Sequence, residues 1–419
     1  MSKTITRDSR VVQVNDGIIG PVEPREKSVK PRKIDDFLGV PNPYLEVARN
    51  YSSTLLMGPP ICDELVALIQ HMFTEEEASL VRHIKPLKKR TAGELARAEH
   101  RSIEEACEIL EHLANEKHIL MSSGPEDDRR YMIMPMAGGT FELVQMGTSV
   151  GTSEDPLFDW RRRFAELYEE LFKTGYGVDY AKHSPSLLRS LPIGQSIESN
   201  PMALPSDRLE EVLDRYQTFA VGRCGCRMTK RHLGEDCGRP LETCTGMGDS
   251  VESAISKGWM RRADKEEILE IKAQAEASGL VNWVINVDEK SGRLFNVMCS
   301  CCGCCCDVFR SITEFNTPGL IAPPHFKPAF DQDRCIYCGL CAKKCQLGAI
   351  TVDTKRKIRA HQSQRCIGCG QCVVVCQNRA IRMEPTLRYK RPAKSYPMMG
   401  LKLFPNLLRL AWNLRKDRR

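Results

Sequence analysis

A pattern of four cysteines occurs twice towards the C-terminal end of the chain, and it constrains the fold more than any other feature. The first copy, C-I-Y-C-G-L-C-A-K-K-C, starts at Cys335, and the second, C-I-G-C-G-Q-C-V-V-V-C, starts at Cys366. In the spacing C-x2-C-x2-C-x3-C, three thiolates of a tight loop can bind one iron–sulfur cubane while the fourth reaches another. Gly339, Gly368 and Gly370 would permit the tight turns between the ligands. The repeat therefore predicts two [4Fe-4S] clusters.

Two other uses of clustered cysteines fit the repeat less well. Zinc sites usually take paired C-x2-C units that are spread over a longer stretch of chain. Disulfides need an oxidising compartment, and nothing in the sequence indicates one. Iron–sulfur ligation is therefore the favoured interpretation.

The stretch from Cys335 to Ile381 resembles the bacterial-type two-cluster ferredoxin domain, a small α+β unit with pseudo-twofold symmetry. The resemblance implies two sets of four ligands, one for each cluster: Cys335, Cys338, Cys341 and Cys376 for the first, and Cys366, Cys369, Cys372 and Cys345 for the second. The family usually has proline after the fourth cysteine of each copy, whereas this chain has Gln346 and Gln377. Glutamine keeps the backbone N–H that proline lacks, so the clusters could be tuned differently.

Length, composition and charge bound the rest of the molecule. A chain of 419 residues is expected to form roughly two to four domains. Its 20 cysteines are concentrated in the second half, which indicates metal binding rather than scattered bridges. No apolar run is long enough to span a membrane, and the N-terminus lacks the apolar core of a secretory signal. These features predict a cytoplasmic protein of an anaerobic prokaryote. The net charge of +7 is mild for a chain of this length.

The N-terminal part is expected to be helical after a flexible leader. Residues 1–45 are rich in proline and charge, and we expect them to form this leader, with a docking segment near Phe37. From Ile61 the apolar residues recur at helical spacing. Capping boxes predict three helix starts: Thr74 with Glu77, Thr91 with Glu94, and Ser102 with Glu105. A hairpin is predicted over residues 119–134.

Helices followed by a hairpin form the order of elements in a winged helix-turn-helix domain, and residues 61–136, within a domain of residues 46–150, resemble that family. In DNA-binding members the second helix of the helical pair enters the major groove. Here that helix is acidic. It has five glutamates, Glu104, Glu105, Glu108, Glu111 and Glu116, and two basic residues, Arg101 and Lys117. Because DNA repels an acidic helix, protein docking is favoured over DNA binding. Cys62 and Cys107 lie at apolar helical positions and are expected to be inert core residues.

A helical connector of residues 151–222 leads into a second cysteine-rich region, the middle region, at residues 223–315. It contains ten cysteines: Cys224, Cys226, Cys237, Cys244, Cys299, Cys301, Cys302, Cys304, Cys305 and Cys306. A predicted hairpin of residues 281–287 and 294–298 leads into the dense run of cysteines. Adjacent residues of a strand point to opposite faces, so the dense run cannot serve one site unless a turn at Gly303 gathers several thiols.

We interpret these ten cysteines as candidate ligands of at least one additional iron–sulfur cluster, although their spacing fits no familiar cluster motif. Two clusters, one unusual cluster, structural zinc and spare thiols are the alternatives. Four neighbouring basic residues would offset the negative charge of a thiolate-bound cluster: Arg223, Arg227, Arg231 and His232.

Residues 386–419 form a basic tail in which Phe404, Leu408 and Trp412 are interleaved with Lys and Arg. A basic amphipathic helix of this kind can pack on its own domain, fit a groove of a partner protein or lie on an anionic membrane.

Together these features predict an α+β multidomain protein: a winged helix-turn-helix-like N-terminal domain, a mixed helical cysteine-rich middle, and a ferredoxin-like dicluster domain at residues 325–385. We expect it to pass single electrons between redox protein partners, as a component of an oxidoreductase system rather than a stand-alone enzyme, and we assign no catalytic residue. No motif supports flavin or nicotinamide binding. Two alternatives are a redox-sensing regulator that binds DNA through the winged helix, and an Fe–S reductase with its active site in the middle region.

Overall fold

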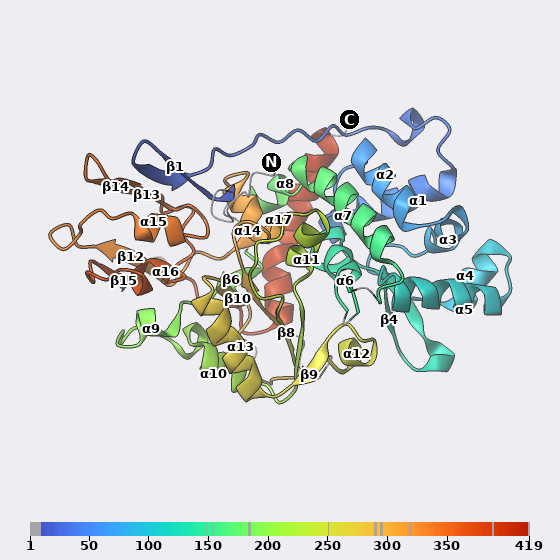
Figure 1. The fold of residues 1–419 in the computed structure, drawn as a ribbon. Helices are drawn as coiled ribbons and strands as arrows, with labels where there is room; N and C mark the ends of the chain where they lie inside the picture. The colour runs from blue at the N-terminus through green and yellow to red at the C-terminus, as the bar shows by residue number, and fades with distance from the viewer. Residues whose placement is uncertain are drawn as a thin grey trace.

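The computed structural model describes residues 10–147, 149–152, 154–182, 186–249, 251–288, 291–293, 296–317, 320–387 and 389–417. In Figure 1 the N-terminal helices lie on the right, the cysteine repeat lies on the left, and the strands of the middle region lie between them. The fold is a mixed arrangement of helices and several small sheets.

The N-terminal helical unit consists of short helices and one small sheet. Its elements are η2 Ile34–Asp36, α1 Asn42–Tyr51, η3 Thr54–Leu56, α2 Asp63–Met72, α3 Glu75–Val81, β3 Arg90–Thr91, α4 Ala92–Glu99, α5 Ile103–Glu111, η4 His112–Glu116, β4 Leu120–Ser123, η5 Glu126–Asp128, β5 Arg130–Ile133, η6 Met136–Thr140 and α6 Phe141–Val144. All three predicted capping boxes are present, at Thr74, Thr91 and Ser102. The predicted hairpin is formed by β4 and β5, and β3 joins it in the order β3-β5-β4.

The first described residues differ from the expected flexible leader. β1 Val12–Asn15 and β2 Ile18–Pro21 form a hairpin across Asp16 and Gly17, whose φ angles are 46° and 86°. β2 also pairs with β13 of the C-terminal repeat, so the N-terminal chain extends a sheet at the far end of the molecule. Phe37, expected in a docking segment, is buried in the core of the N-terminal helices.

The connector and middle region surround one antiparallel sheet. The elements are α7 Phe158–Lys173, α8 Val178–Lys182, β6 Leu188–Ser190, α9 Gly194–Ile197, η7 Pro205–Asp207, α10 Leu209–Leu213, β7 Phe219–Arg223, α11 Gly225–His232, β8 Glu242–Met247, α12 Val251–Ser256, β9 Arg261–Ala263, α13 Lys265–Ala277, β10 Val281–Ile285, β11 Asn296–Cys301 and α14 Asp307–Thr313. The sheet has six strands in the order β6-β10-β11-β8-β7-β9, and α13 packs against four of them. The predicted hairpin is present as β10 and β11, although residues 294 and 295 lie outside the described residues.

A buried ion network connects α7 to the helices of the middle region. Glu169 of α7 receives hydrogen bonds from Arg310 of α14 at 2.7 Å and from Lys230 of α11 at 2.9 Å. Tyr168 donates to the carboxylate of Asp307 at 2.7 Å. These charges are nearly inaccessible to water, so the network fixes α7 against the start of α14, directly after Cys306.

The C-terminal repeat unit, residues 326–385, has the pseudo-symmetry that the resemblance to a two-cluster ferredoxin domain implied. Its elements are β12 Phe326–Phe330, α15 Leu340–Lys344, β13 Ile350–Asp353, β14 Ile358–His361, α16 Gln371–Val374 and β15 Ile381–Pro385. β12 pairs with β15, and β13 pairs with β14. Each copy therefore runs from a cysteine loop into a short helix and then a strand.

The basic tail forms α17 Tyr396–Asp417, which contacts η3 of the N-terminal unit. Leu410 is buried, whereas Leu401, Phe404, Leu408 and Trp412 are exposed. None of the helices in the described parts of the chain is long and apolar enough to cross a membrane.

Candidate metal centres

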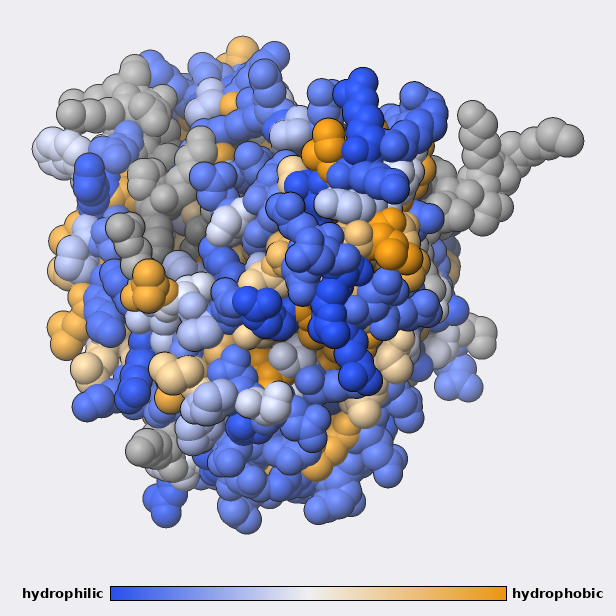
Figure 2. Space-filling view, turned by 90° about the vertical axis from the view of Figure 1, so that its left-hand side faces the viewer, coloured by the Kyte–Doolittle hydropathy of each residue, from blue (hydrophilic) through white to orange (hydrophobic). Residues whose placement is uncertain are grey.

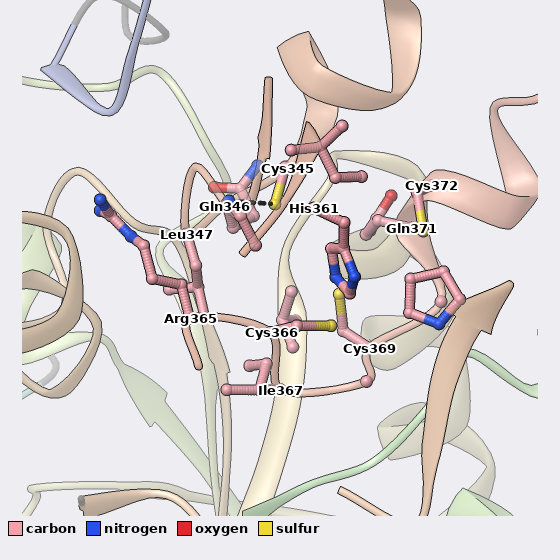
Figure 3. A pocket seen from close by; sticks show the side chains of 16 residues that line it. Cys345, Gln346, Leu347, His361, Arg365, Cys366, Ile367, Cys369, Gln371 and Cys372 are labelled. Atoms are coloured by element: carbon pink, nitrogen blue, oxygen red, sulfur yellow. Dashed lines mark hydrogen bonds between the residues drawn. The ribbon is translucent and has the colours of Figure 1, made fainter. Parts of the chain in front are cut away.

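The second predicted ligand set lines one pocket of the repeat unit. Cys345, Cys366, Cys369 and Cys372 all contribute to its wall, and Figure 3 shows these side chains around it. Burial raises the pKa of Cys366 to about 11 and that of Cys369 to about 12. Such thiols keep their protons at neutral pH until a metal displaces them. The donor set fits a [4Fe-4S] cluster.

The glycines between the cysteines of the two copies have the turn conformations that the sequence predicted. Gly339, Gly368 and Gly370 have φ angles of 77°, 70° and 80°. A Cβ at Gly368 would also lie 2.2 Å from the carbonyl oxygen of Phe326. Any other residue at position 368 would therefore be strained and would also collide with β12.

The first predicted ligand set lies nearer the surface. Cys338 is exposed, and Cys335, Cys341 and Cys376 are half-buried. The pKa of Cys341 is raised to about 11, by burial first and then by the neighbouring thiols of Cys338 and Cys335. Arg359 donates a hydrogen bond to the sulfur of Cys335 at 3.1 Å. A cluster bound here would be the one more accessible to a partner.

One hydrogen bond recurs in both copies of the repeat. The backbone N–H of Ala349 donates to the sulfur of Cys345 at 3.2 Å, and that of Ala380 donates to the sulfur of Cys376 at 3.3 Å. In each copy the acceptor is the fourth cysteine. Hydrogen bonds to ligand sulfurs help to set a cluster's reduction potential, so the two copies are tuned alike at this position.

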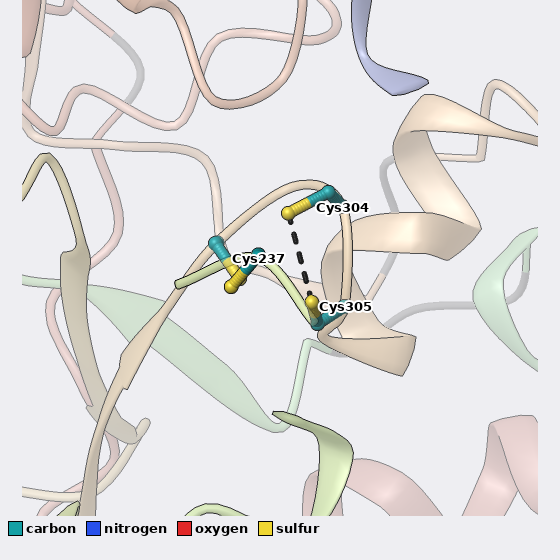
Figure 4. Close-up of side chains that lie close together, drawn as sticks. Cys237, Cys304 and Cys305 are labelled. Atoms are coloured by element: carbon teal, nitrogen blue, oxygen red, sulfur yellow. Dashed lines mark hydrogen bonds between the residues drawn. The ribbon is translucent and has the colours of Figure 1, made fainter. Parts of the chain in front are cut away.

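Four thiols of the middle region converge on one point, and we call them the four-thiol site: Cys237, Cys302, Cys304 and Cys305. Their sulfur atoms all lie within 4.8 Å of one another, and all four residues are buried. Figure 4 shows how the loop carrying Cys304 and Cys305 brings their thiols towards Cys237. Hydrogen bonds from the other three thiols lower the pKa of Cys302 below its usual range. The spacing fits a single tetrahedral zinc or iron ion, because metal–sulfur bonds of about 2.3 Å place the sulfurs about 3.8 Å apart.

The other six cysteines of the middle region form a second group, the six-thiol site: Cys224, Cys226, Cys244, Cys299, Cys301 and Cys306. Their thiols form a row of neighbours that runs Cys224, Cys226, Cys306, Cys301, Cys299, Cys244, in which each thiol shifts the pKa of the next. The sulfurs of Cys244 and Cys299 are 3.7 Å apart. The indole N–H of Trp283 donates to the sulfur of Cys301 at 3.0 Å.

Strand geometry separates the two groups. Cys299 and Cys301 occupy alternate positions of β11 and face the six-thiol site, whereas Cys302 follows directly and belongs to the four-thiol site. The turn at Gly303 then brings Cys304 and Cys305 to the same side as Cys302. The predicted division of the dense run between two faces is therefore present, and Gly303 is the turn that gathers the second group.

Only one of the four basic residues expected to offset cluster charge is buried beside the thiols. Arg227 is 1% exposed, and although burial lowers its pKa, the neighbouring sulfurs of Cys224 and Cys302 raise that pKa above its ordinary value. The other three lie elsewhere: Arg223 donates to the carbonyl oxygen of Val150, Arg231 pairs with Asp236, and His232 packs against Phe158. The partners of these three side chains are therefore groups other than the cysteine sulfurs.

Sequence reasoning missed two cationic residues at these sites. Lys272 of α13 is fully buried and donates to the carbonyl oxygens of Thr243 and Met298 and to the hydroxyl of Ser300. Arg239 donates to the sulfur of Cys304 at 3.4 Å. Neither residue belongs to a motif. The position of Lys272 on α13 becomes buried only when the helix packs on the sheet.

The four-thiol site touches the repeat unit. The backbone N–H of Gly303 donates to the side-chain oxygen of Gln346 at 3.2 Å, and a Cβ at Gly303 would lie 1.7 Å from the carbonyl oxygen of Gln346. Gln346 directly follows Cys345, a predicted ligand of the second cluster. The glutamine that replaces the usual proline thus joins the repeat to the dense run of cysteines.

The two remaining cysteines are apart from these groups. Cys62 is buried in the N-terminal core, where burial raises its pKa to about 12, and Cys107 is half-buried on α5. Neither is among the thiols gathered in the described metal-binding groups, as expected of inert residues.

Comparison with known proteins agrees with the chemistry of the repeat unit. No curated protein and no solved structure matched the chain. Residues 329–383 match the family model of the 4Fe-4S dicluster domain. The chain thus contains an iron–sulfur dicluster domain near its C-terminus, with [4Fe-4S] clusters as its cofactors and a cysteine cluster in the region before it.

Proposed function

We propose that this protein transfers single electrons between protein partners, through a path that runs from the first cluster to the second and on to an iron ion held by the four-thiol site. The observation that carries the proposal is the junction at Gly303 and Gln346. There Gln346, which directly follows the predicted cluster ligand Cys345, contacts Gly303 in the loop between Cys302 and Cys304. A carrier that served only as a two-cluster ferredoxin would not need a second group of thiols within reach of its inner cluster.

The exposure of the two ligand sets supports a direction for this path. Cys338 of the first set is exposed, whereas Cys372 of the second set is buried beneath the surface. Cys372 belongs to the same apolar cluster as Cys302 and Cys304, whereas Cys341 and Cys376 of the first set only pack against the outside of that cluster. An electron arriving at the surface would therefore reach the first cluster, then the second, and then the middle region.

The test is a rapid reduction experiment on the anaerobically purified protein. Dithionite-reduced ferredoxin is the donor, and the spectra of the dicluster domain and the middle region are followed separately. In Cys369→Ser, which removes a predicted ligand of the second cluster, the middle region should be reduced at least tenfold more slowly. The matched control is Cys107→Ser, which changes a cysteine outside every site. Equal rates in both variants would refute the proposed path, and a signal perturbed by a small-molecule substrate would favour a reductase.

We propose that the donor is an acidic redox protein. The acids of the matched domain are Asp331, Asp333 and Asp353, whereas its exposed basic residues are more numerous: Arg334, Lys343, Lys344, Lys355, Arg356, Lys357, Arg379 and Arg382. Figure 2 shows that this end of the molecule is mainly hydrophilic, with small separate apolar patches. A basic face around the accessible cluster would steer an acidic donor.

Salt dependence and charge reversal test the acidic donor. Lys343→Glu combined with Lys344→Glu should lower the second-order rate of reduction about tenfold at low salt, and the difference should shrink as salt is added. Lys88→Glu combined with Lys89→Glu changes two exposed lysines of the N-terminal unit and should leave the rate unchanged. Equal rates for the two double variants would argue against this docking face.

We propose that the N-terminal unit is a winged-helix module used for protein docking. The order α3, β3, α4, α5, β4, β5 and the sheet β3-β5-β4 support the resemblance. Glu104, Glu105 and Glu108 are exposed on α5, the helix that would enter a DNA groove. A gel-shift assay with genomic DNA fragments, under oxidising and reducing conditions, should show no retardation. Retardation that depends on redox state would favour a DNA-binding regulator instead.

We propose that α17 binds an acidic partner protein through its exposed side. Leu401, Phe404, Leu408 and Trp412 supply apolar area, and Lys402 and Arg409 supply positive charge. Removing residues 396–419 should weaken copurification with such a partner without changing the iron content. Binding of the full chain to anionic vesicles, lost on truncation, would assign the helix to a membrane surface instead.

A further inference from the structure

Ten thiols in the middle region form two groups of different shape, and the six-thiol site is the one whose shape is unsuited to a single ion. Within the described residues, only the four-thiol site brings three or more ligand atoms within 4.8 Å of one another. The six-thiol site is extended, with each thiol close to one or two neighbours in the row from Cys224 to Cys244. A cluster of several irons joined by sulfide takes thiolates from around its edge, whereas one ion needs them at a single point.

The six thiols come from four separate segments. Cys224 and Cys226 lie at the end of β7 and the start of α11, Cys244 lies on β8, Cys299 and Cys301 lie on β11, and Cys306 precedes α14. Pairing of β7 with β8 and of β8 with β11 brings these segments together. All six are free thiols rather than disulfides. A fold that only needed small apolar side chains there would not require cysteine from every segment.

Two buried cations lie beside the sulfurs. Lys272 is fully buried and faces the thiols of Cys299 and Cys244. Arg227 lies between the two thiol groups, and its Nε is buried without a hydrogen-bond partner. Both cations donate hydrogen bonds to neutral oxygens, but neither forms an ion pair with a carboxylate within the described residues. A buried cation without a counter-charge is costly, so the fold implies a compensating negative charge at this place.

Carboxylates supply little of that charge. Asp307 lies near Cys226 but accepts hydrogen bonds from Tyr168 and Arg310, and Glu276 near Lys272 is bound to Asn282. Neutral thiols supply none. Four or more thiolates around a cluster carry a net negative charge, which two cations would balance.

We propose that the six-thiol site binds its own multi-iron iron–sulfur cluster, distinct from the metal of the four-thiol site and from both clusters of the dicluster domain. Of the six thiols, Cys226, Cys306, Cys301 and Cys299 occupy the centre of the row and are the cluster's main ligands. Trp283 donates a hydrogen bond to the sulfur of Cys301, in the position of a group that tunes a cluster.

The test compares metal content in matched double variants that are purified without oxygen. Iron, zinc and acid-labile sulfide per chain are measured in Cys226→Ser with Cys306→Ser, in Cys304→Ser with Cys305→Ser, and in Cys62→Ala with Cys107→Ala. The first variant should lose about four irons and about four sulfides, and the third should lose none. The low-temperature EPR signals of the dicluster domain report whether each variant is folded.

Two results would overturn the proposal. One is an unchanged iron and sulfide content in Cys226→Ser with Cys306→Ser while the dicluster signals persist, and the other is loss of zinc in place of iron. If that variant does not fold, Lys272→Met decides, because it keeps every thiol and removes one cation. One EPR-monitored couple should then shift to lower potential while the dicluster couples stay fixed, and the absence of any shift would refute the site.

Discussion

The contact between Gln346 and Gly303 can be tested by removing one acceptor atom. Gln346→Leu keeps the approximate side-chain size but deletes the oxygen that accepts the Gly303 N–H at 3.2 Å. Gly303 and Gln346 are both buried, so water cannot replace the lost partner. An unsatisfied buried donor costs about 1–3 kcal/mol, and we expect the free energy of unfolding to fall by that amount.

The matched control is the equivalent glutamine of the other copy. Gln377 follows Cys376 as Gln346 follows Cys345, but it is exposed, so Gln377→Leu should change the stability by no more than about 0.5 kcal/mol. Both variants are unfolded with urea under anaerobic conditions, and the loss of visible cluster absorbance gives the midpoint. Equal midpoints for the two variants would show that the junction contributes nothing to stability, and our reading of the glutamine would be wrong.

Three further changes have expected outcomes. Gly303→Ala should lower the urea midpoint by the equivalent of about 1–3 kcal/mol because its Cβ would meet a backbone oxygen, whereas Gly177→Ala, with open space around it, should have little effect. The pKa of Glu169 is lowered to about 2, because its two cationic partners outweigh burial, so its stabilisation is complete above about pH 4.5 and is lost as the pH falls towards 2. The stability difference between the wild type and Glu169→Gln, about 3 kcal/mol at pH 7, should therefore shrink across that range in thermal melts. Trp283→Phe removes the hydrogen bond to Cys301 and should lower the potential of one middle-region couple by tens of millivolts in redox titrations; an unchanged titration would contradict this role.

Local patterns predicted the parts of the fold that depend on local geometry. The cysteine spacing and the glycines at 339, 368 and 370 fix the loops of the repeat, and the three capping boxes fix helix starts, because each signal involves only neighbouring residues. The N-terminal hairpin carried a signal of the same kind. An N-D-G turn stands between two short apolar runs at Asp16 and Gly17, but proline and charge nearby favoured a leader.

The partners of the middle-region thiols could not be predicted from spacing. The alternation of side chains along β11 predicts that Cys301 and Cys302 point to opposite faces of the sheet. Which of the earlier cysteines lies beside each of them depends on the pairing of strands that are far apart in the sequence. Cys237 and Cys244 are close in sequence and yet belong to different groups, because Cys244 is held in β8 and Cys237 lies before it. Lys272 was missed for a related reason, since a lysine on a helix is usually solvated and only the assembled sheet buries it.

The two copies of the repeat are alike in their ligands, but their surroundings make them unequal. Cys345 is followed by a buried glutamine bonded to the middle region, and Cys376 is followed by an exposed one. The same hydrogen bond to the fourth cysteine occurs in both copies, so the inequality comes from what lies outside the repeat. Because burial and nearby charge influence a cluster's potential, two identical motifs placed in this way would hold clusters of different potential. The direction of electron flow that we propose would follow from this difference in surroundings, because the ligands of the two copies are the same.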